Sequence, residues 1–221
     1  MTDSRRVVIL GGHGKVALIV APLLTQLGFE IDAVIRNPEH RSAVELPGVT
    51  AVVLDIETAS VDDLTAVFSG AFAVVFSAGA GGGNPARTRA VDFEAATRAV
   101  RAAETAGVKR FVMVSYAGSG SDLERLDPDN SFYPYAKAKS DADEFLRAST
   151  LDYTILGPGM LTLEPATARV TVLGSDNRPT DTSTSRANVA AMIAHVLANN
   201  AAIRQTVDFV DGPTPILSVV T

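Results

Sequence analysis

Tyr135 and Lys139 form the pair of side chains best placed for acid–base chemistry. They are four residues apart, so on a helix they share one face. A phenol beside an ammonium group is a proton donor, because the cation draws the pKa of the phenol towards neutrality. Ser115 ends the apolar stretch that precedes this helix and could add a hydroxyl. Tyr133 and Lys137 repeat the spacing, so spacing alone does not choose between the pairs.

A second group of residues, near the N-terminus, is typical of a site for a dinucleotide diphosphate. An apolar run ending at Leu10 leads into a glycine-rich turn, and a helical pattern follows. Glycines let the backbone approach the phosphates, and the first helical turn offers free N–H groups. Two registers fit, Gly11-x-x-Gly14-x-x-Ala17 and Gly12-x-Gly14-x-x-Ala17, and we favour the first because Gly11 directly follows the strand. The residues predicted to bind the cofactor here are Gly11, Gly12, His13, Gly14, Lys15 and Val16.

Around these residues, apolar runs rich in Val and Ile alternate with helical patterns. Several runs are apolar on both faces, as buried parallel strands are. The alternation predicts an α/β fold: a Rossmann-like, doubly wound parallel sheet with helices on both faces. The 221 residues suit a single domain, 1–221, with a small C-terminal substrate region. The expected strands are 6–10, 30–35, 51–54, 71–76, 110–115, 152–156 and 206–210, and the expected helices are 14–27, 60–68, 85–106, 135–149 and 185–199.

Composition argues against several kinds of site. The chain has no cysteine, which excludes disulfides and thiolate metal sites and suits a reducing compartment, so we expect a cytoplasmic protein. A formal net charge of -6 argues against a nucleic-acid or anionic-membrane binder. The three histidines lack ligand spacing, so no metal site is expected. No apolar run reaches membrane-spanning length, and residues 1–6 are too polar for a signal peptide.

The end of the second expected strand indicates which dinucleotide is bound. Proteins that prefer NAD usually place an acid there for the ribose hydroxyls, whereas this strand ends at Arg36. A guanidinium group can hold a phosphate through two hydrogen bonds, so we expect NADP(H) with Arg36 on its 2′-phosphate. Asp55 follows the third strand and could accept a hydrogen bond from adenine while Ile56 packs on the ring. It could equally cap a turn.

Two loops, 78–85 and 118–130, follow expected strands at their carboxyl ends, where ligands bind in open α/β sheets. The first loop is rich in glycine, which suggests backbone packed against a ligand. Its residues Ala78, Gly79 and Ala80 are predicted to contact the cofactor. The substrate region is expected mainly from residues 116–132 and 157–184.

Together these stretches resemble the atypical short-chain dehydrogenase/reductase proteins of the NAD(P)H-binding type, relatives of flavin and biliverdin reductases and of NADP sensors. The likeness covers nearly the whole chain. It is carried by the glycine turn, Arg36, Asp55-Ile56, Ser77-Ala78-Gly79 and the segments 106–115, 135–143, 151–162 and 185–190.

The resemblance implies catalytic roles for three residues. Tyr135 would donate a proton to a substrate carbonyl while hydride arrives from the nicotinamide. Lys139 would lower the pKa of the tyrosine and hold the nicotinamide ribose, and Ser115 would hydrogen-bond the carbonyl oxygen. The family register Lys-x-x-Ala-Asp begins at Lys139, which favours this pair over Tyr133 and Lys137.

One stretch departs from the family pattern. Where the family often has Arg-Pro-Gly, this chain has Gly157-Pro158-Gly159, so whatever the arginine anchors is absent. We still expect Pro158, Gly159 and Met160 to flank the nicotinamide. Asp92 is expected on the helix surface or as a loop anchor, not as a catalytic acid.

The sequence therefore predicts an NADPH-dependent oxidoreductase that transfers hydride to a small carbonyl, quinone or flavin-like acceptor. The alternative is an NADP(H)-binding redox sensor without turnover. A nucleotide-sugar epimerase is a third hypothesis, less favoured because such proteins usually carry a larger C-terminal region. The expected partner is a small-molecule substrate that the sequence does not identify, without nucleic acid or membrane, for a monomer or homodimer.

Overall fold

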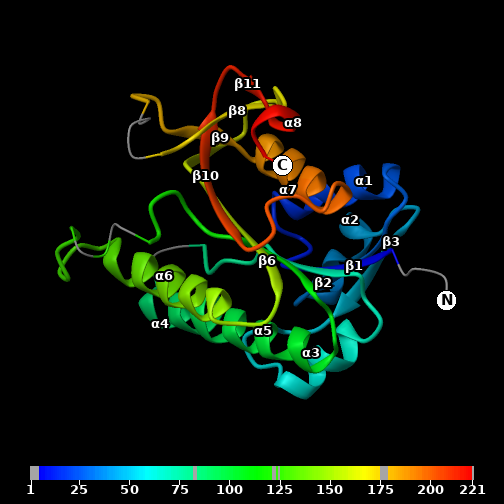
Figure 1. Cartoon of the computed structure of the whole chain (residues 1–221). Coiled ribbons are helices and arrows are strands. Elements are labelled where there is room, and N and C mark those ends of the chain that lie inside the picture. The colour runs from blue at the N-terminus through cyan, green and yellow to red at the C-terminus, as the bar shows by residue number, and fades with distance from the viewer. Residues whose placement is uncertain (1–4, 82–83, 121–122, 124, 175–178, 221) are drawn as a thin grey trace.

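Among the residues that the computed structural model describes (5–81, 84–120, 123, 125–174 and 179–220), nine strands form one central sheet with helices on both faces (Figure 1). Their order is β11-β8-β10-β6-β5-β4-β1-β2-β3. The parallel strands are β1 (Arg6–Leu10), β2 (Glu30–Ile35), β3 (Val49–Val53), β4 (Ala73–Phe76), β5 (Arg110–Val114), β6 (Asp152–Pro158) and β10 (Gln205–Asp211). The predicted Rossmann-like parallel sheet is thus confirmed.

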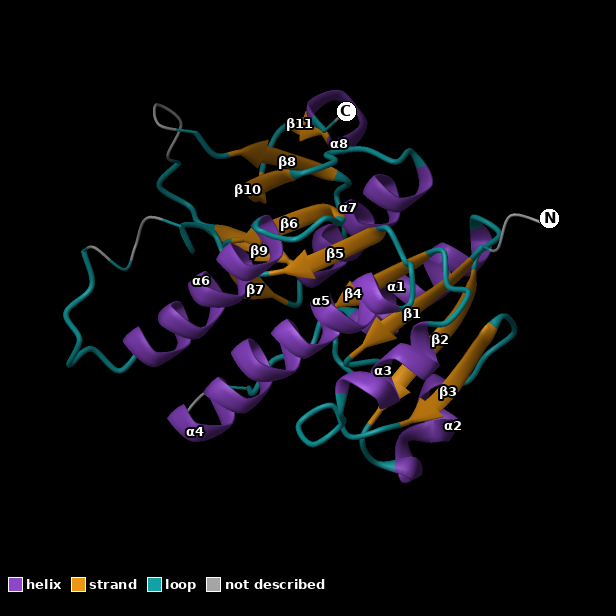
Figure 2. Cartoon of the chain, turned by 60° about the horizontal axis from the view of Figure 1, so that its bottom comes forward, coloured by secondary structure: helices purple, strands orange, loops and turns teal. Residues whose placement is uncertain are grey.

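The C-terminal part of the chain contains further strands that the sequence pattern did not predict. β8 (Arg169–Val172) runs antiparallel to β10, and the two-residue β11 (Thr214–Pro215) pairs with β8. β7 (Met160–Thr162) and β9 (Ser183–Ser185) form a separate parallel pair (Figure 2). These strands have two to four residues each and lack a buried apolar run, so they give no period that a sequence scan can detect.

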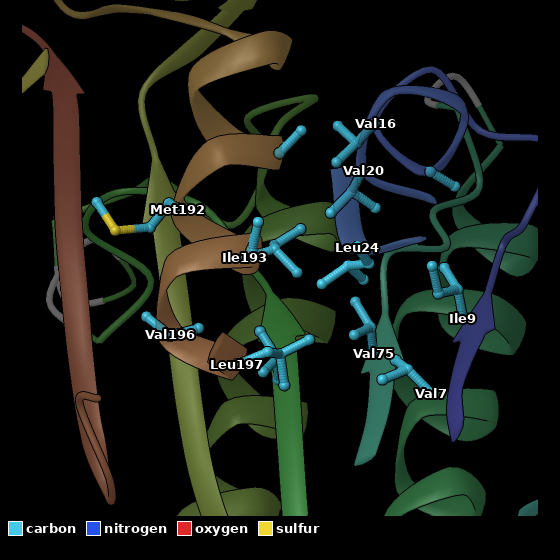
Figure 3. Close-up of a cluster of buried hydrophobic side chains, with 14 of the residues drawn as sticks. Val7, Ile9, Val16, Val20, Leu24, Val75, Met192, Ile193, Val196 and Leu197 are labelled. Atoms are coloured by element: carbon cyan, nitrogen blue, oxygen red, sulfur yellow. The ribbon is translucent and has the colours of Figure 1, made fainter. Parts of the chain in front are cut away.

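Helices cover the sheet on both sides because both faces of its strands are apolar. Successive side chains of a strand point to opposite faces. Val7 and Ile9 of β1 pack under α1 and α7, as Figure 3 shows, whereas Val8 and Leu10 pack under α3, α5 and α6. One layer contains α1 (Ala17–Gln26), η1 (Pro38–His40), α2 (Arg41–Val44), α7 (Arg186–Ala198) and α8 (Ile216–Val219), and the other contains α3 (Val61–Phe68), α4 (Pro85–Thr88), η2 (Arg89–Ala95), α5 (Ala96–Thr105) and α6 (Tyr133–Arg147).

The long helix expected over residues 85–106 consists of three segments. α4 and α5 are α-helical, and η2 between them is a π-helix. A π segment turns side chains away from the positions that an α-helix would give them, and it is frequent at functional sites. Asp92 lies in this segment and is buried, and its place in the site follows below.

Arg110, at the start of β5, ties the sheet to α7. Its guanidinium donates to the carbonyl oxygens of Asp152 (2.8 Å), Val196 (3.2 Å) and Ala201 (3.0 Å), and to the hydroxyl of Thr154 (2.8 Å). Burial lowers the pKa of Arg110 to about 10, although Asp152 opposes the shift. The side chain therefore stays charged near neutral pH and holds β5 and β6 in place under the helix.

Replacing Arg110 with Met should lower the free energy of unfolding by about 3 kcal/mol, because several buried acceptors lose their donors. Urea unfolding would measure this loss. The matched control is Lys109→Met, an exposed neighbour whose change should stay within about 0.5 kcal/mol. Equal stability of the two variants would contradict the anchoring role of Arg110.

Candidate functional site

A cleft of about 1430 Å³ runs along the carboxyl ends of β1, β2, β4 and β5. It brings together most of the residues that the sequence predicted for the site, from segments far apart in the chain. They are Gly11, His13, Gly14, Lys15, Val16, Arg36, Asp55, Ile56, Ala78, Gly79, Ala80, Ser115, Tyr135 and Lys139.

The glycine turn follows the favoured register. Gly11 has a φ of +81°, which side chains other than glycine rarely adopt. Its carbonyl accepts from the amide of Gly14 at 2.7 Å, and a Cβ on Gly14 would lie 2.9 Å from that same oxygen. α1 therefore begins at Ala17 rather than at Gly14, because residues 11–16 form the turn.

Gly12 occupies a different place from its neighbours in the turn. Its amide donates to the carbonyl of Val34 at 2.8 Å, and a Cβ would lie 2.8 Å from Ala33. It packs the end of β1 against β2 and is not among the residues that line the cleft.

Basic side chains gather at the β2 end of the cleft. Arg36 and Arg87 both donate to Oε1 of Glu57, at 3.0 and 2.9 Å, so two guanidinium groups share one carboxylate. The side chain of Arg36 is 55% exposed, which leaves it accessible to a ligand. His13 and His40 also line the cleft, and their rings stack with centroids 3.7 Å apart. The sequence did not indicate Arg87 or His40, because nothing in their local pattern places them at this end.

Asp55 lines the cleft and also holds a turn. Its Oδ1 accepts from the amide of Glu57 at 3.0 Å. Of the two roles left open for Asp55, the structure shows the turn contact, and the contact with adenine stays a prediction.

One face of α6 carries the proton chemistry. Tyr135, Lys139 and Asp143 follow at intervals of four residues and all point inward. Nζ of Lys139 donates to the carbonyl of Val114 at 2.8 Å and lies 3.4 Å from Oδ1 of Asp92. The side chains of this ion pair are 4% and 0% exposed.

Asp92 is one of the residues whose expected place needs correction. It is not on the helix surface, because the π segment turns it into the protein. Its Oδ2 accepts from the amide of Ala80 at 3.1 Å, so it is the loop anchor, which was the other expected role. Residues 78–81 of that loop line the cleft, whereas Gly82 and Gly83 lie outside the described residues.

The pKa of Tyr135 also differs from expectation. Burial raises this pKa above its usual value, and the charges of Asp92 and Asp143 raise it further, while Lys139 opposes the shift only in part. The expected lowering of the Tyr135 pKa towards neutrality is therefore wrong. Burial and the charges of Asp92 and Asp143 raise this pKa by more than the charge of Lys139 lowers it. Burial acts to lower the pKa of Lys139 itself, but Tyr135, Asp92 and Asp143 raise it overall. Both groups are protonated near neutral pH.

Asp143 is a functional candidate that the sequence analysis missed. It is fully buried, and its Oδ2 accepts from the hydroxyls of Ser115 and Ser119, each at 2.6 Å. Burial raises the pKa of its carboxyl, while the two serines and then Lys139 act to lower it. The signal was present, because Asp143 follows Lys139 by four residues.

A second pocket of about 720 Å³ adjoins the cleft and shares Ser115, Phe132, Tyr135 and Leu161 with it. The rings of Phe132, Tyr135 and Tyr116 contact one another here with centroids 5.3–5.7 Å apart. Pro158, Gly159 and Met160 line this pocket and not the cleft; their predicted contact with nicotinamide stays a prediction.

Asp208, which lines the second pocket, explains why a glycine stands at position 157, where the family often has arginine. A Cβ on Gly157 would lie 2.0 Å from Oδ1 of Asp208, so no larger residue fits without displacing that carboxylate. Oδ2 of Asp208 accepts from the amide of Gly118 at 2.9 Å, which anchors the loop after β5. Ser121, Asp122 and Glu124 of that loop, and residues 175–178 of the predicted substrate region, lie outside the described residues.

The described residues contain no cluster of three or more side chains able to hold a metal ion. Their helices are too short or too polar to cross a bilayer.

Comparison with known proteins gives consistent matches over almost the whole chain. A family described as NAD(P)H-binding matches residues 11–200. A UPF0659 protein of Saccharomyces cerevisiae is 36% identical over an alignment of 217 residues that covers 96% of this chain and 95% of the relative. A solved Bacillus halodurans protein, named as an NAD-dependent epimerase/dehydratase, has a TM-score of 0.86 at 34% identity and 97% coverage of both chains. An oxidoreductase of Lactococcus lactis has a TM-score of 0.84 at 27% identity, covering 96% of this chain and 94% of its own.

The ion pair between Lys139 and Asp92 predicts a strong coupling in stability. Lys139→Met should cost about 3–5 kcal/mol of unfolding free energy at neutral pH, because it leaves a buried carboxylate without its cation. The double variant with Asp92→Asn should recover most of the loss, as measured by urea unfolding. Lys137→Met, on the solvent side of the same helix, is the control and should cost less than about 1 kcal/mol. Simple additivity of the two changes would contradict the coupling.

Proposed function

The chain belongs to the NAD(P)H-binding family, and from that premise we propose that it is an NADPH-dependent oxidoreductase acting on a small carbonyl, quinone or flavin-like acceptor. The observation that carries the proposal is the place of Ser115 and Tyr135. Both line the cleft and the second pocket, at the junction of the two, and Lys139 lies beside them in the cleft. A cofactor in one and an acceptor in the other would meet at these side chains.

The cleft fits a dinucleotide phosphate on geometric grounds. A Cβ on Gly11 would collide with Ala78, and a Cβ on Gly14 would collide with the carbonyl oxygen of Gly11. Glycine at both positions therefore allows a compact turn whose backbone stays open to the diphosphate. At the β2 end, Arg36 and Arg87 supply two positive charges against the one of Glu57, which supports a 2′-phosphate and hence NADPH over NADH.

Bound NADPH would supply a hydride, and the chain would supply the proton and the orientation. Tyr135 keeps its proton near neutral pH, so it acts as a donor to the acceptor oxygen rather than as a base. Lys139 stays charged and stabilises the phenolate that remains after the transfer. The apolar second pocket, formed in part by the described residues of 116–132 and 157–184, would hold the acceptor and exclude water.

A second candidate function is epimerisation of a nucleotide sugar. The name of the Bacillus halodurans protein favours it, and this chain covers 97% of that protein, so size does not argue against it here. An epimerase regenerates its cofactor in each turnover, whereas a reductase consumes NADPH. The redox-sensor alternative requires the cleft alone, and the acceptor-sized pocket beside Tyr135 favours turnover instead.

Arg36→Ala should weaken NADPH binding by about 10- to 100-fold, the value of one or two charge-assisted hydrogen bonds, and leave NADH binding unchanged. Fluorescence titration with both nucleotides would measure this. Arg41→Ala is the control, since Arg41 pairs with Glu45 and does not line the cleft. Equal losses for the two nucleotides would contradict a 2′-phosphate contact.

Tyr135→Phe should lower the rate of NADPH oxidation with carbonyl acceptors by about 10²- to 10⁴-fold, because the proton donor is lost. Cofactor affinity should stay nearly unchanged. Tyr133→Phe tests the alternative pair and should behave as wild type. A flavin-type acceptor could take hydride without a protein acid, so the screen must include ketones and quinones. Wild-type rates in Tyr135→Phe for every acceptor would refute the proposed mechanism.

A further inference from the structure

Asp143 is the buried ionisable group for which the proposed mechanism has no role. Its Oδ2 receives two hydroxyl hydrogens, from Ser115 and Ser119, at distances typical of bonds to a charged oxygen. Its Oδ1 is buried without a hydrogen-bond partner among the described residues. One of its two serine partners, Ser115, lines both the cleft and the second pocket.

A serine hydroxyl has one hydrogen to donate and two lone pairs that accept. While Asp143 is ionised, the hydrogen of Ser115 is used on Oδ2, so Ser115 offers only lone pairs to a ligand. A carbonyl oxygen also offers only lone pairs, and the two groups would repel. Ser115 can therefore donate to a carbonyl acceptor only if Asp143 releases that hydrogen.

We propose that Asp143 is a positioning residue whose protonation decides whether Ser115 donates or accepts a hydrogen bond on the substrate side. When Asp143 is protonated, its own O–H donates to Oγ of Ser115, and the serine hydrogen turns to the acceptor oxygen beside Tyr135. No proton leaves Asp143 in this step. The inference rests on the proposed oxidoreductase function, because it concerns a carbonyl acceptor.

The charged and polar groups around Asp143 come from several elements. Lys139 and Arg147 face it from its own helix, and Ser115 and Ser119 face it from the segment that follows β5. Lys139 in turn pairs with Asp92 of η2. Tyr135 and Lys139 have pKa values raised above their already high ordinary values. Of Tyr135, Lys139 and Asp143, the carboxyl of Asp143 is therefore the group expected to lose its proton first as pH rises.

The direction of the pH dependence follows from this arrangement. Reduction should be fast while Asp143 is protonated and should decline as pH rises through its pKa. Removing the Ser119 hydroxyl takes away one hydrogen bond that favours the charged carboxylate. The pKa of Asp143 should then rise by about one pH unit, since a hydrogen bond to a charged group is worth about tenfold in proton affinity.

The test compares a spectroscopic titration with a kinetic one. The infrared carbonyl band of the protonated carboxylic acid is titrated in wild type and Ser119→Ala, with Asp143→Asn to identify the band. The pH dependence of kcat/KM for NADPH oxidation with a carbonyl acceptor is measured on the same proteins. We expect equal midpoints by both methods and the same upward shift in Ser119→Ala. Asp143→Asn should lose the band and the decline at high pH, because its amide keeps Ser115 a donor.

Two control variants separate this role from a structural one. Asp141→Asn removes a charge from the solvent side of the same helix. Ser149→Ala removes a hydroxyl that donates to the carbonyl of Leu146 and accepts from the amide of Leu151, away from Asp143. Both should retain the wild-type pH profile. If Asp143 merely anchored the loop, its Asn variant would lower the rate equally at every pH.

The outcomes are distinguishable. A band midpoint that shifts in Ser119→Ala without a matching shift in the kinetics would overturn the inference and leave the proposed function intact. A decline at high pH that persists in Asp143→Asn would do the same. An absence of NADPH oxidation by the wild type with any acceptor would refute the proposed function, and the inference with it.

Discussion

The rest of the site depends on the contacts made by the buried ammonium group of Lys139. Lys139 belongs to α6, and its ammonium group joins this helix to two other elements. It donates to the carbonyl oxygen of Val114 at the end of β5, and it pairs with Asp92 of η2. Asp92 in turn holds the amide of Ala80, so the same charge fixes the loop that lines the cleft. A cation buried to this extent is tolerated only with close partners, and those partners are the groups that shape the site.

The sheet explains how so few residues can control a large cleft. β1, β4, β5 and β6 are parallel neighbours, so their carboxyl ends lie along one edge. The glycine turn, the loop that Asp92 anchors and Ser115 each follow one of these strands. Burial of both sheet faces, by α1 and α7 on one side and α3, α5 and α6 on the other, keeps that edge in register.

The electrostatic character of the site depends more on burial than on the identity of its residues. The tyrosine–lysine spacing indicates a donor with a lowered pKa, yet Asp92 and Asp143 share the charge of the lysine and burial dominates. The result is a phenol that holds its proton and a serine whose hydrogen is directed at a carboxylate. The first effect concerns which group keeps its proton, and the second concerns where a hydroxyl hydrogen points.

Sequence alone determined the parallel sheet, the place of Gly11 as the turn glycine and the shared helix face of Tyr135 and Lys139. These follow from short-range rules: strand periodicity, a glycine directly after a strand, and the i, i+4 spacing on one helix. Only the tertiary structure decided that Asp92 turns inward, that Gly12 packs on Ala33, and that Arg87 joins Arg36 on Glu57. Those contacts join residues 12 to 47 positions apart, and a π segment or a loop sets them, so no local pattern contains them.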